Sequence, residues 1–153
     1  MKNSQIHYFS VGGTPDPAEK NYSNNGAAAN SIVIGRNTDA AWINTIAIGN
    51  NTSTNIQDVI IIGHGAVSED RNNFVIGNSA KALGGQNMAV GLYAISGGKD
   101  SLGGVNQGAT AIGHQANAIG HSSTALGYQA KTGLDATNAV ALGRETNVTG
   151  KGG

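Results

Sequence analysis

The chain of 153 residues is poor in several kinds of residue, and each shortage excludes a class of protein. It has no cysteine, which excludes a disulfide framework and a thiolate metal site. Aromatic residues make up 5% of the chain, so a core of large side chains is hard to build. No apolar run approaches the roughly 20 residues that a helix needs to span a bilayer. The segment Met1 to Gln5 has no apolar region and does not predict a secretory signal.

Charge is scarce as well, because charged residues make up 12% of the chain and its net charge is zero. A neutral chain has no electrostatic reason to bind nucleic acid or an anionic membrane, so we expect neither as a partner. Glycine, in contrast, occupies 24 positions. A chain rich in glycine, alanine and short aliphatic residues favours close approach of backbones over a core of bulky side chains.

The chain does contain a repeat, in which an aliphatic residue is followed by glycine. The first five such glycines are equally spaced, and the same spacing returns between the sixth and seventh. Only the steps from Gly91 to Gly113 and from Gly127 to Gly143 are longer. A fixed period of this kind predicts a solenoid of stacked coils. The repeat turn glycines are Gly35, Gly49, Gly63, Gly77, Gly91, Gly113, Gly127 and Gly143.

The residues before each glycine predict a strand, because they form short, largely β-branched runs bounded by Gly and Asn. A second, weaker strand is expected after each glycine, where small residues such as Ala80 and Ala82 stand two positions apart and so share one face. These features predict an all-β, two-sheet parallel β-roll with 14-residue coils, and the spacing alone leaves open which face of the first strand lies inside. We assign the structural repeat core to the column directly before the glycines: Ile34, Ile48, Ile62, Ile76, Val90, Ile112, Leu126 and Leu142.

Three segments are expected along the chain. Residues 1–30 form an N-terminal lead-in and first-coil cap, residues 31–149 form the β-roll repeats, and residues 150–153 form a C-terminal tail. The long step from Gly91 to Gly113 exceeds the period by eight, which predicts an irregular loop at about residues 97–104.

A single copy of the roll would leave an apolar surface bare. The run Val59 to Ile62 is apolar on both faces of its strand, and such strands must be covered on both faces. The sequence offers no amphipathic helix to cover the outer one. Further copies packed around a rotation axis are the simplest cover, although this reasoning does not give their number.

The block Asn44 to Gly49 resembles the repeat of YadA-like heads in trimeric autotransporter adhesins, and the segments His7 to Val11 and Asn21 to Ala27 resemble the start of such heads. The resemblance covers roughly residues 7–149. It implies a homotrimer of left-handed parallel β-rolls on the bacterial cell surface. It also implies non-catalytic adhesion to host extracellular matrix, cells or surfaces, and autoaggregation. We see no neck, stalk or membrane anchor, so we expect a head fragment whose link to the outer membrane lies in parts absent from this chain.

Catalytic, cofactor and metal sites are not predicted. His64 and His114 follow repeat glycines and His121 falls half a repeat later, which is poor geometry for a shared metal. Gly98-Lys99 is no phosphate loop, because Tyr93 stands where that motif needs glycine and Asp100 where it needs Ser or Thr.

The turns supply a candidate contact patch for a host partner whose identity the sequence leaves open. Its residues are Leu92, Tyr93, Lys99, Asp100 and Tyr128. Trp42, the only tryptophan, is expected to cap the first coil or pack between chains, and less so to contact a partner.

Two other functions fit a repeat-built rod. A trimeric phage tail-fibre segment is the main alternative, since repeat chemistry alone does not separate it from an adhesin. An ice-binding solenoid is less favoured because Thr110 and Thr124 share a column that holds Ile and Phe in earlier coils. A hexapeptide acyltransferase would need a period of 6 in place of the local spacing of 7 seen from Gly113 to Gly120.

Overall fold

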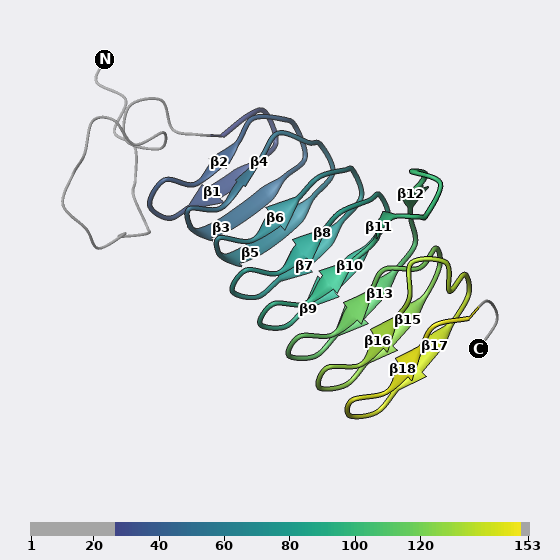
Figure 1. Ribbon diagram of the computed structural model, residues 1–153. Coiled ribbons are helices and arrows are strands. Elements are labelled where there is room, and N and C mark those ends of the chain that lie inside the picture. Colours follow the sequence, from purple (N-terminus) through teal and green to yellow (C-terminus); the bar gives the residue numbers. More distant parts are fainter. Residues whose placement is uncertain (1–26, 151–153) are drawn as a thin grey trace, which may run out of the picture.

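The computed structural model describes residues 27–150 as a stack of coils, each with one strand in each of two parallel sheets (Figure 1). The predicted lead-in, including His7 and Asn21, therefore lies almost wholly outside the described residues, as do residues 151–153. Between residues 27 and 150 the structure has no helix, so none there could cross a membrane. The all-β parallel solenoid expected from the repeat is confirmed.

The first sheet contains the strands that precede the repeat glycines. Its order along the stack is β1 (Ile32–Ile34), β3 (Ile46–Asn50), β5 (Ile60–His64), β7 (Phe74–Ile76), β9 (Met88–Val90), β13 (Thr110–Ile112), β15 (Thr124–Leu126) and β17 (Val140–Leu142).

The second sheet contains the short strands predicted after each glycine, and it runs along the stack in the same sense. Its members are β2 (Asp39–Ala40), β4 (Ser53–Thr54), β6 (Val67–Ser68), β8 (Lys81–Ala82), β10 (Ile95–Ser96), β14 (Asn117–Ala118), β16 (Lys131–Thr132) and β18 (Asn147–Val148).

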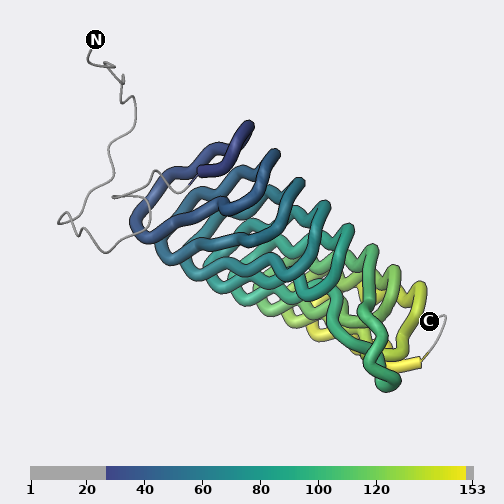
Figure 2. The backbone as a smooth tube through the Cα atoms, turned by 90° about the horizontal axis from the view of Figure 1, so that it is seen from above, coloured from purple at the N-terminus to yellow at the C-terminus, as the bar shows by residue number. Residues whose placement is uncertain are grey.

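Pairing between coils follows the period of the sequence. Ile46 pairs with Ile60 and Ile60 with Phe74, so each residue meets its equivalent one period further along the chain. The register continues across both irregular intervals, since Thr110 pairs with Met88 and Thr124 with Val140. The tube view shows the coils stacked in one continuous rod (Figure 2). The extra residues therefore leave the ladder without changing its alignment.

Two edges connect the sheets. The glycine edge is the set of connections from first-sheet to second-sheet strands, such as residues 35–38. The insertion edge is the set of opposite connections, such as residues 133–139, and it holds both irregular intervals. Each connection has a residue with positive φ, such as Asn51 (53°) on the glycine edge and Asn44 (57°) on the insertion edge. Asn tolerates this left-handed conformation better than most residues, which accounts for its frequency in these turns.

The interior of the roll is thin and is lined by small side chains. From the second coil onward the middle column of the first sheet is fully buried, and Val33 of the first coil is partly buried. The fully buried residues are Ala47, Ile61, Val75, Ala89, Ala111, Ala125 and Ala141. This column faces buried small residues of the second sheet, such as Ala82 and Ala118. The small-residue pairs predicted on one strand face are buried, including Ala80 with Ala82. Small side chains fit best between sheets joined by such short connections, and Ile61 and Val75 are the larger members of this interior.

The assignment of the repeat core to Ile34, Ile48, Ile62, Ile76, Val90, Ile112, Leu126 and Leu142 does not hold for the interior of one chain. Successive residues of a strand point to opposite faces, so burial of the middle column turns this column outward. Six of these side chains are half-buried, and Leu126 and Leu142 are 41% and 66% exposed. These residues can form a core only against another molecule.

The extra residues after β10 form a small antiparallel hairpin. Its strands are β11 (Gly98–Lys99) and β12 (Val105–Asn106), which pair as Gly98 with Asn106 and Lys99 with Val105. The hairpin stands off the stack at the insertion edge (Figure 1). The segment predicted as an irregular loop at about 97–104 thus contains regular pairing at its base.

Candidate functional site

The outer side of the first sheet carries a continuous apolar surface, which we call the apolar face. Its residues are Ile32, Ile34, Ile46, Ile48, Ile60, Ile62, Phe74, Ile76, Met88, Val90, Thr110, Ile112, Thr124, Leu126, Val140 and Leu142. All but the two threonines are apolar. The corresponding column of the second sheet is mixed, with Asp39, Lys81 and Lys131 among its members. One side of the roll is therefore built to avoid water and the other to face it.

The predicted contact patch is divided by the structure into two parts. Leu92 and Tyr93 lie on the glycine edge before β10, with exposed fractions of 40% and 51%, and Tyr128 lies on the same edge. Lys99 and Asp100 lie in the hairpin that follows β10, on the insertion edge. The two groups occupy opposite ends of strand β10, so they do not form one surface.

Tyr128, one residue of the glycine-edge part, belongs to an aromatic and basic ladder. His114, Tyr128 and Arg144 each follow a repeat glycine and so stack at the same place in successive coils. The rings of His114 and Tyr128 meet edge to face with their centroids 5.3 Å apart. The guanidinium carbon of Arg144 lies 5.5 Å from the centroid of the Tyr128 ring, within cation–π range. Tyr93 has a φ of 56°, an uncommon value for a bulky residue.

Trp42 lies on the insertion edge between the first two coils and is 51% exposed. Its Nε1 donates a hydrogen bond to Oδ1 of Asn55, 3.1 Å away in the next coil. The side chain therefore spans neighbouring coils at the surface.

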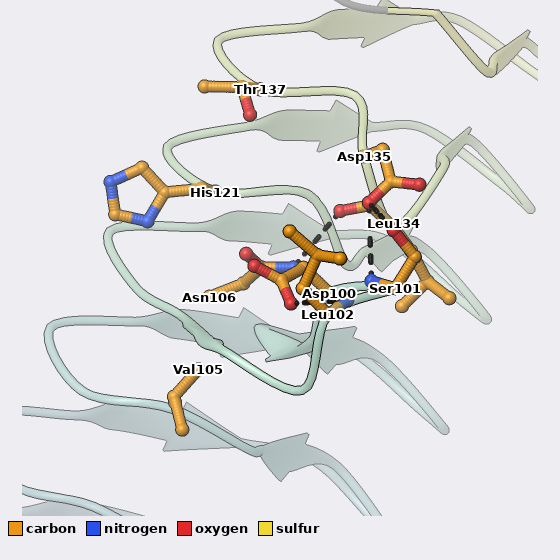
Figure 3. Close-up of a pocket in the computed structure, with 9 residues that line it drawn as sticks. All are labelled: Asp100, Ser101, Leu102, Val105, Asn106, His121, Leu134, Asp135 and Thr137. Atoms are coloured by element: carbon orange, nitrogen blue, oxygen red, sulfur yellow. Dashed lines mark hydrogen bonds between the residues drawn. The ribbon is translucent and has the colours of Figure 1, made fainter.

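The insertion edge contains a pocket of about 440 Å³ beside the hairpin, which we call the insertion pocket (Figure 3). Three successive connections supply its lining: Asp100, Ser101, Leu102, Val105 and Asn106 from the hairpin, His121 from the next coil, and Leu134, Asp135 and Thr137 from the coil after that.

Side-chain hydrogen bonds hold the hairpin over this pocket. The Asp135 Oδ1 atom accepts bonds from the Ser101 amide nitrogen at 3.3 Å and from the Ser101 Oγ at 2.9 Å. The Asn106 Nδ2 atom donates to the carbonyl oxygens of Ile119 at 2.7 Å and of Leu134 at 3.0 Å. The His121 Nδ1 atom accepts a bond from the Gln107 amide nitrogen at 3.2 Å. These bonds tie three coils together.

Sequence reasoning included Asp100 of this pocket in the contact patch but missed Asn106, Leu134 and Asp135 as contributors. The available signal was the slightly lengthened step of the repeat between Gly127 and Gly143. Both irregular intervals place their extra residues on the same edge, which becomes evident once the coils are stacked.

The insertion pocket gathers several hydrogen-bonding side chains at one place. Within residues 27–150, no three His, Asp or Glu side chains gather in a way that could hold a metal ion. Asp100, Asp135 and His121 bring hydrogen-bonding atoms to one pocket.

Two segments of the chain, residues 27–52 and 106–131, match the family model of the YadA head domain repeat. The chain carries YadA head domain repeats. This match confirms the resemblance predicted from the sequence, and the YadA head family is an adhesin family. Each matched YadA segment spans strands of both sheets and both edges of a coil. Comparison with curated proteins finds no match to the chain.

Proposed function

We propose that this chain is the head segment of a bacterial trimeric autotransporter adhesin, displayed at the cell surface and tethered to the outer membrane by other parts of its protein. In this role it binds host extracellular matrix, cells or surfaces and promotes autoaggregation without catalysis. The proposal rests on the YadA head repeats and on the bare apolar face of the same coils.

The apolar face supports assembly of identical chains. Its strands lie side by side over eight coils, and Ile32 and Val140 near its two ends are 52% and 53% exposed. Contiguous apolar patches of more than a few hundred Å² are rare on monomers and mark interaction sites. Three copies related by a rotation axis would bury this face in a closed assembly and leave the polar sheet and its edges outside. Three equivalent contact sites would then act together on one target, which strengthens weak contacts through multivalency.

The glycine-edge residues Leu92, Tyr93 and Tyr128 are a proposed contact for the partner. Tyr93→Asn tests this directly, because Asn accepts the left-handed conformation that Tyr93 holds. We expect this variant to keep or gain stability while its binding to the partner weakens.

Adhesion is tested with the purified chain on a panel of immobilised extracellular matrix proteins, with serum albumin as the control surface. The same chain coated on beads tests autoaggregation by turbidity. We expect saturable binding to at least one matrix protein and clustering of the beads. Binding no stronger than to albumin, together with dispersed beads, would contradict the proposal.

A further inference from the structure

The two irregular intervals of the repeat, Gly91 to Gly113 and Gly127 to Gly143, meet in space. Residues of the hairpin bond to residues of the later connection, as Ser101 does to Asp135 and Asn106 to Leu134. The register of the ladder continues across both intervals, so stacking of the coils does not need either insertion. The two additions together enclose the insertion pocket, which points to a role beyond the scaffold.

The pocket contains acceptor atoms that lack partners. Asn106 is 4% exposed, and both of its bonds use Nδ2, so its Oδ1 has no hydrogen-bond partner in the described part of the chain. This Oδ1 atom still reaches solvent, so it is open to a donor group on a ligand. Asp100 and Asp135 each use Oδ1 for internal bonds, which leaves the Oδ2 atoms of both carboxylates without a partner among residues 27–150.

The charge of the pocket is one-sided. Two carboxylates line it, and no lysine or arginine is among its lining residues. Lys99 precedes Asp100 in the hairpin but does not line the cavity.

The walls around these acceptors are apolar. Leu102, Val105 and Leu134 are 94%, 47% and 43% exposed. Figure 3 shows the Leu102 and Leu134 side chains beside the acidic and amide groups, and the Val105 side chain farther from them. Exposed apolar side chains next to unpaired acceptors match a ligand with an aliphatic stem and a cationic head. His121 adds no further acceptor through Nδ1, because that atom already accepts from the Gln107 amide.

We propose that the insertion pocket binds an arginine or lysine side chain presented by the protein to which the head adheres. The cationic head contacts the Oδ2 atoms of Asp100 and Asp135 and the Oδ1 atom of Asn106, and its stem lies against Leu102 and Leu134. A guanidinium group, with five donors and no acceptor, suits these three unpartnered acceptor atoms. The proposal deepens the adhesive function proposed above and rests on it.

The test uses the whole chain, isotopically labelled, and a short arginine-containing peptide as the probe. The matched probe is the same peptide with citrulline, which keeps the shape and removes the charge. We expect the arginine peptide to shift the amide resonances of residues 100–106 and 134–137, and the citrulline peptide to leave them unchanged. Equal shifts with both peptides, or shifts confined to other residues, would overturn the proposal.

Variants measure the contribution of each carboxylate. Asp135→Asn keeps an oxygen that can accept the Ser101 bonds but loses the charge, and Asp100→Asn does the same for the hairpin turn. We expect each to weaken binding of the arginine peptide roughly threefold to tenfold, since both carboxylates are partly solvated. Glu69→Gln removes one negative charge in the turn after β6, outside the pocket, and should leave the affinity within about twofold. Unchanged affinity in both aspartate variants would refute the assignment.

The adhesion panel separates this proposal from the proposed function. Matrix binding that is weakened in Asp135→Asn and retained in Glu69→Gln supports the pocket as the contact. Matrix binding that is unchanged in Asp135→Asn would overturn the pocket while leaving the adhesin function intact.

Discussion

Glycine at position 63 is predicted to be indispensable, whereas glycine at position 65 in the same coil is predicted to be replaceable. Gly63 has a φ of 149°, a conformation that is essentially restricted to glycine. A Cβ atom built at Gly63 would overlap the carbonyl oxygen of Gly77 and lie 2.7 Å from its carbonyl carbon, and both atoms belong to the backbone of the next coil. Neither partner can move without opening the ladder.

Backbone strain of this kind costs about 1–3 kcal/mol. Overpacking against fixed atoms costs about as much again. We therefore expect Gly63→Ala to lower the free energy of unfolding by roughly 2–6 kcal/mol, a large share of the about 5–15 kcal/mol typical of a domain.

Gly65→Ala is the matched control. Gly65 has a φ of 61°, and a Cβ atom there would approach nothing closer than Ser79 Oγ at 3.9 Å. Equivalent positions in other coils hold Asn51 and Ser79 at φ values of 53° and 55°. The left-handed conformation costs alanine about 1–2 kcal/mol, and the stiffer unfolded chain offsets about 0.4–1 kcal/mol of that. The net loss should be at most about 1.5 kcal/mol.

The assay is equilibrium unfolding in urea, followed by circular dichroism at one protein concentration for all variants, since an oligomer's stability depends on concentration. A Gly63→Ala variant that lost no more stability than Gly65→Ala would refute the close stacking of glycine backbones.

Three further substitutions or deletions test other parts of the structure. Ile61→Ala truncates the largest of the fully buried side chains in the described residues. We expect the free energy of unfolding in urea to fall by about 2–3 kcal/mol, near the lower end for such changes because the paired residue is already Ala47. No measurable loss of stability would contradict the burial of Ile61. Ile62→Asp places a charge on the apolar face and should abolish assembly of the chains. The circular dichroism of the separated chain should remain that of a β-roll. An intact oligomer would exclude this face as the interface. Deletion of residues 97–104 leaves a connection between Ser96 and Thr110 that is as long as residues 83–87 one coil earlier, so both sheets should persist. Loss of the β-sheet signal in circular dichroism would show that the hairpin is part of the scaffold.

Much of the fold was predictable from the sequence because the repeat is strict. The position of the glycines set the coil length, and small residues such as Ala80 and Ala82 set the thin interior, since both are local consequences of backbone stacking. Which face of the first strand lies inside could also have been inferred from size. The column containing Ala47 and Ala111 suits a thin interior, and the isoleucine column does not.

The insertion pocket could not be predicted in the same way. Ser101 and Asp135 are far apart in the sequence, and neither belongs to the repeating pattern. Their contact depends on two insertions leaving the same edge two coils apart. The period fixes the ladder register but does not give the path of residues outside the ladder.

The central claim is that identical chains cover the apolar face, and native mass measures this most directly. We expect light scattering after size exclusion to give three times the chain mass of 15.4 kDa over a range of concentrations, and Ile62→Asp to give a single chain mass. A wild-type particle of 15.4 kDa that persists as the concentration rises would contradict the account.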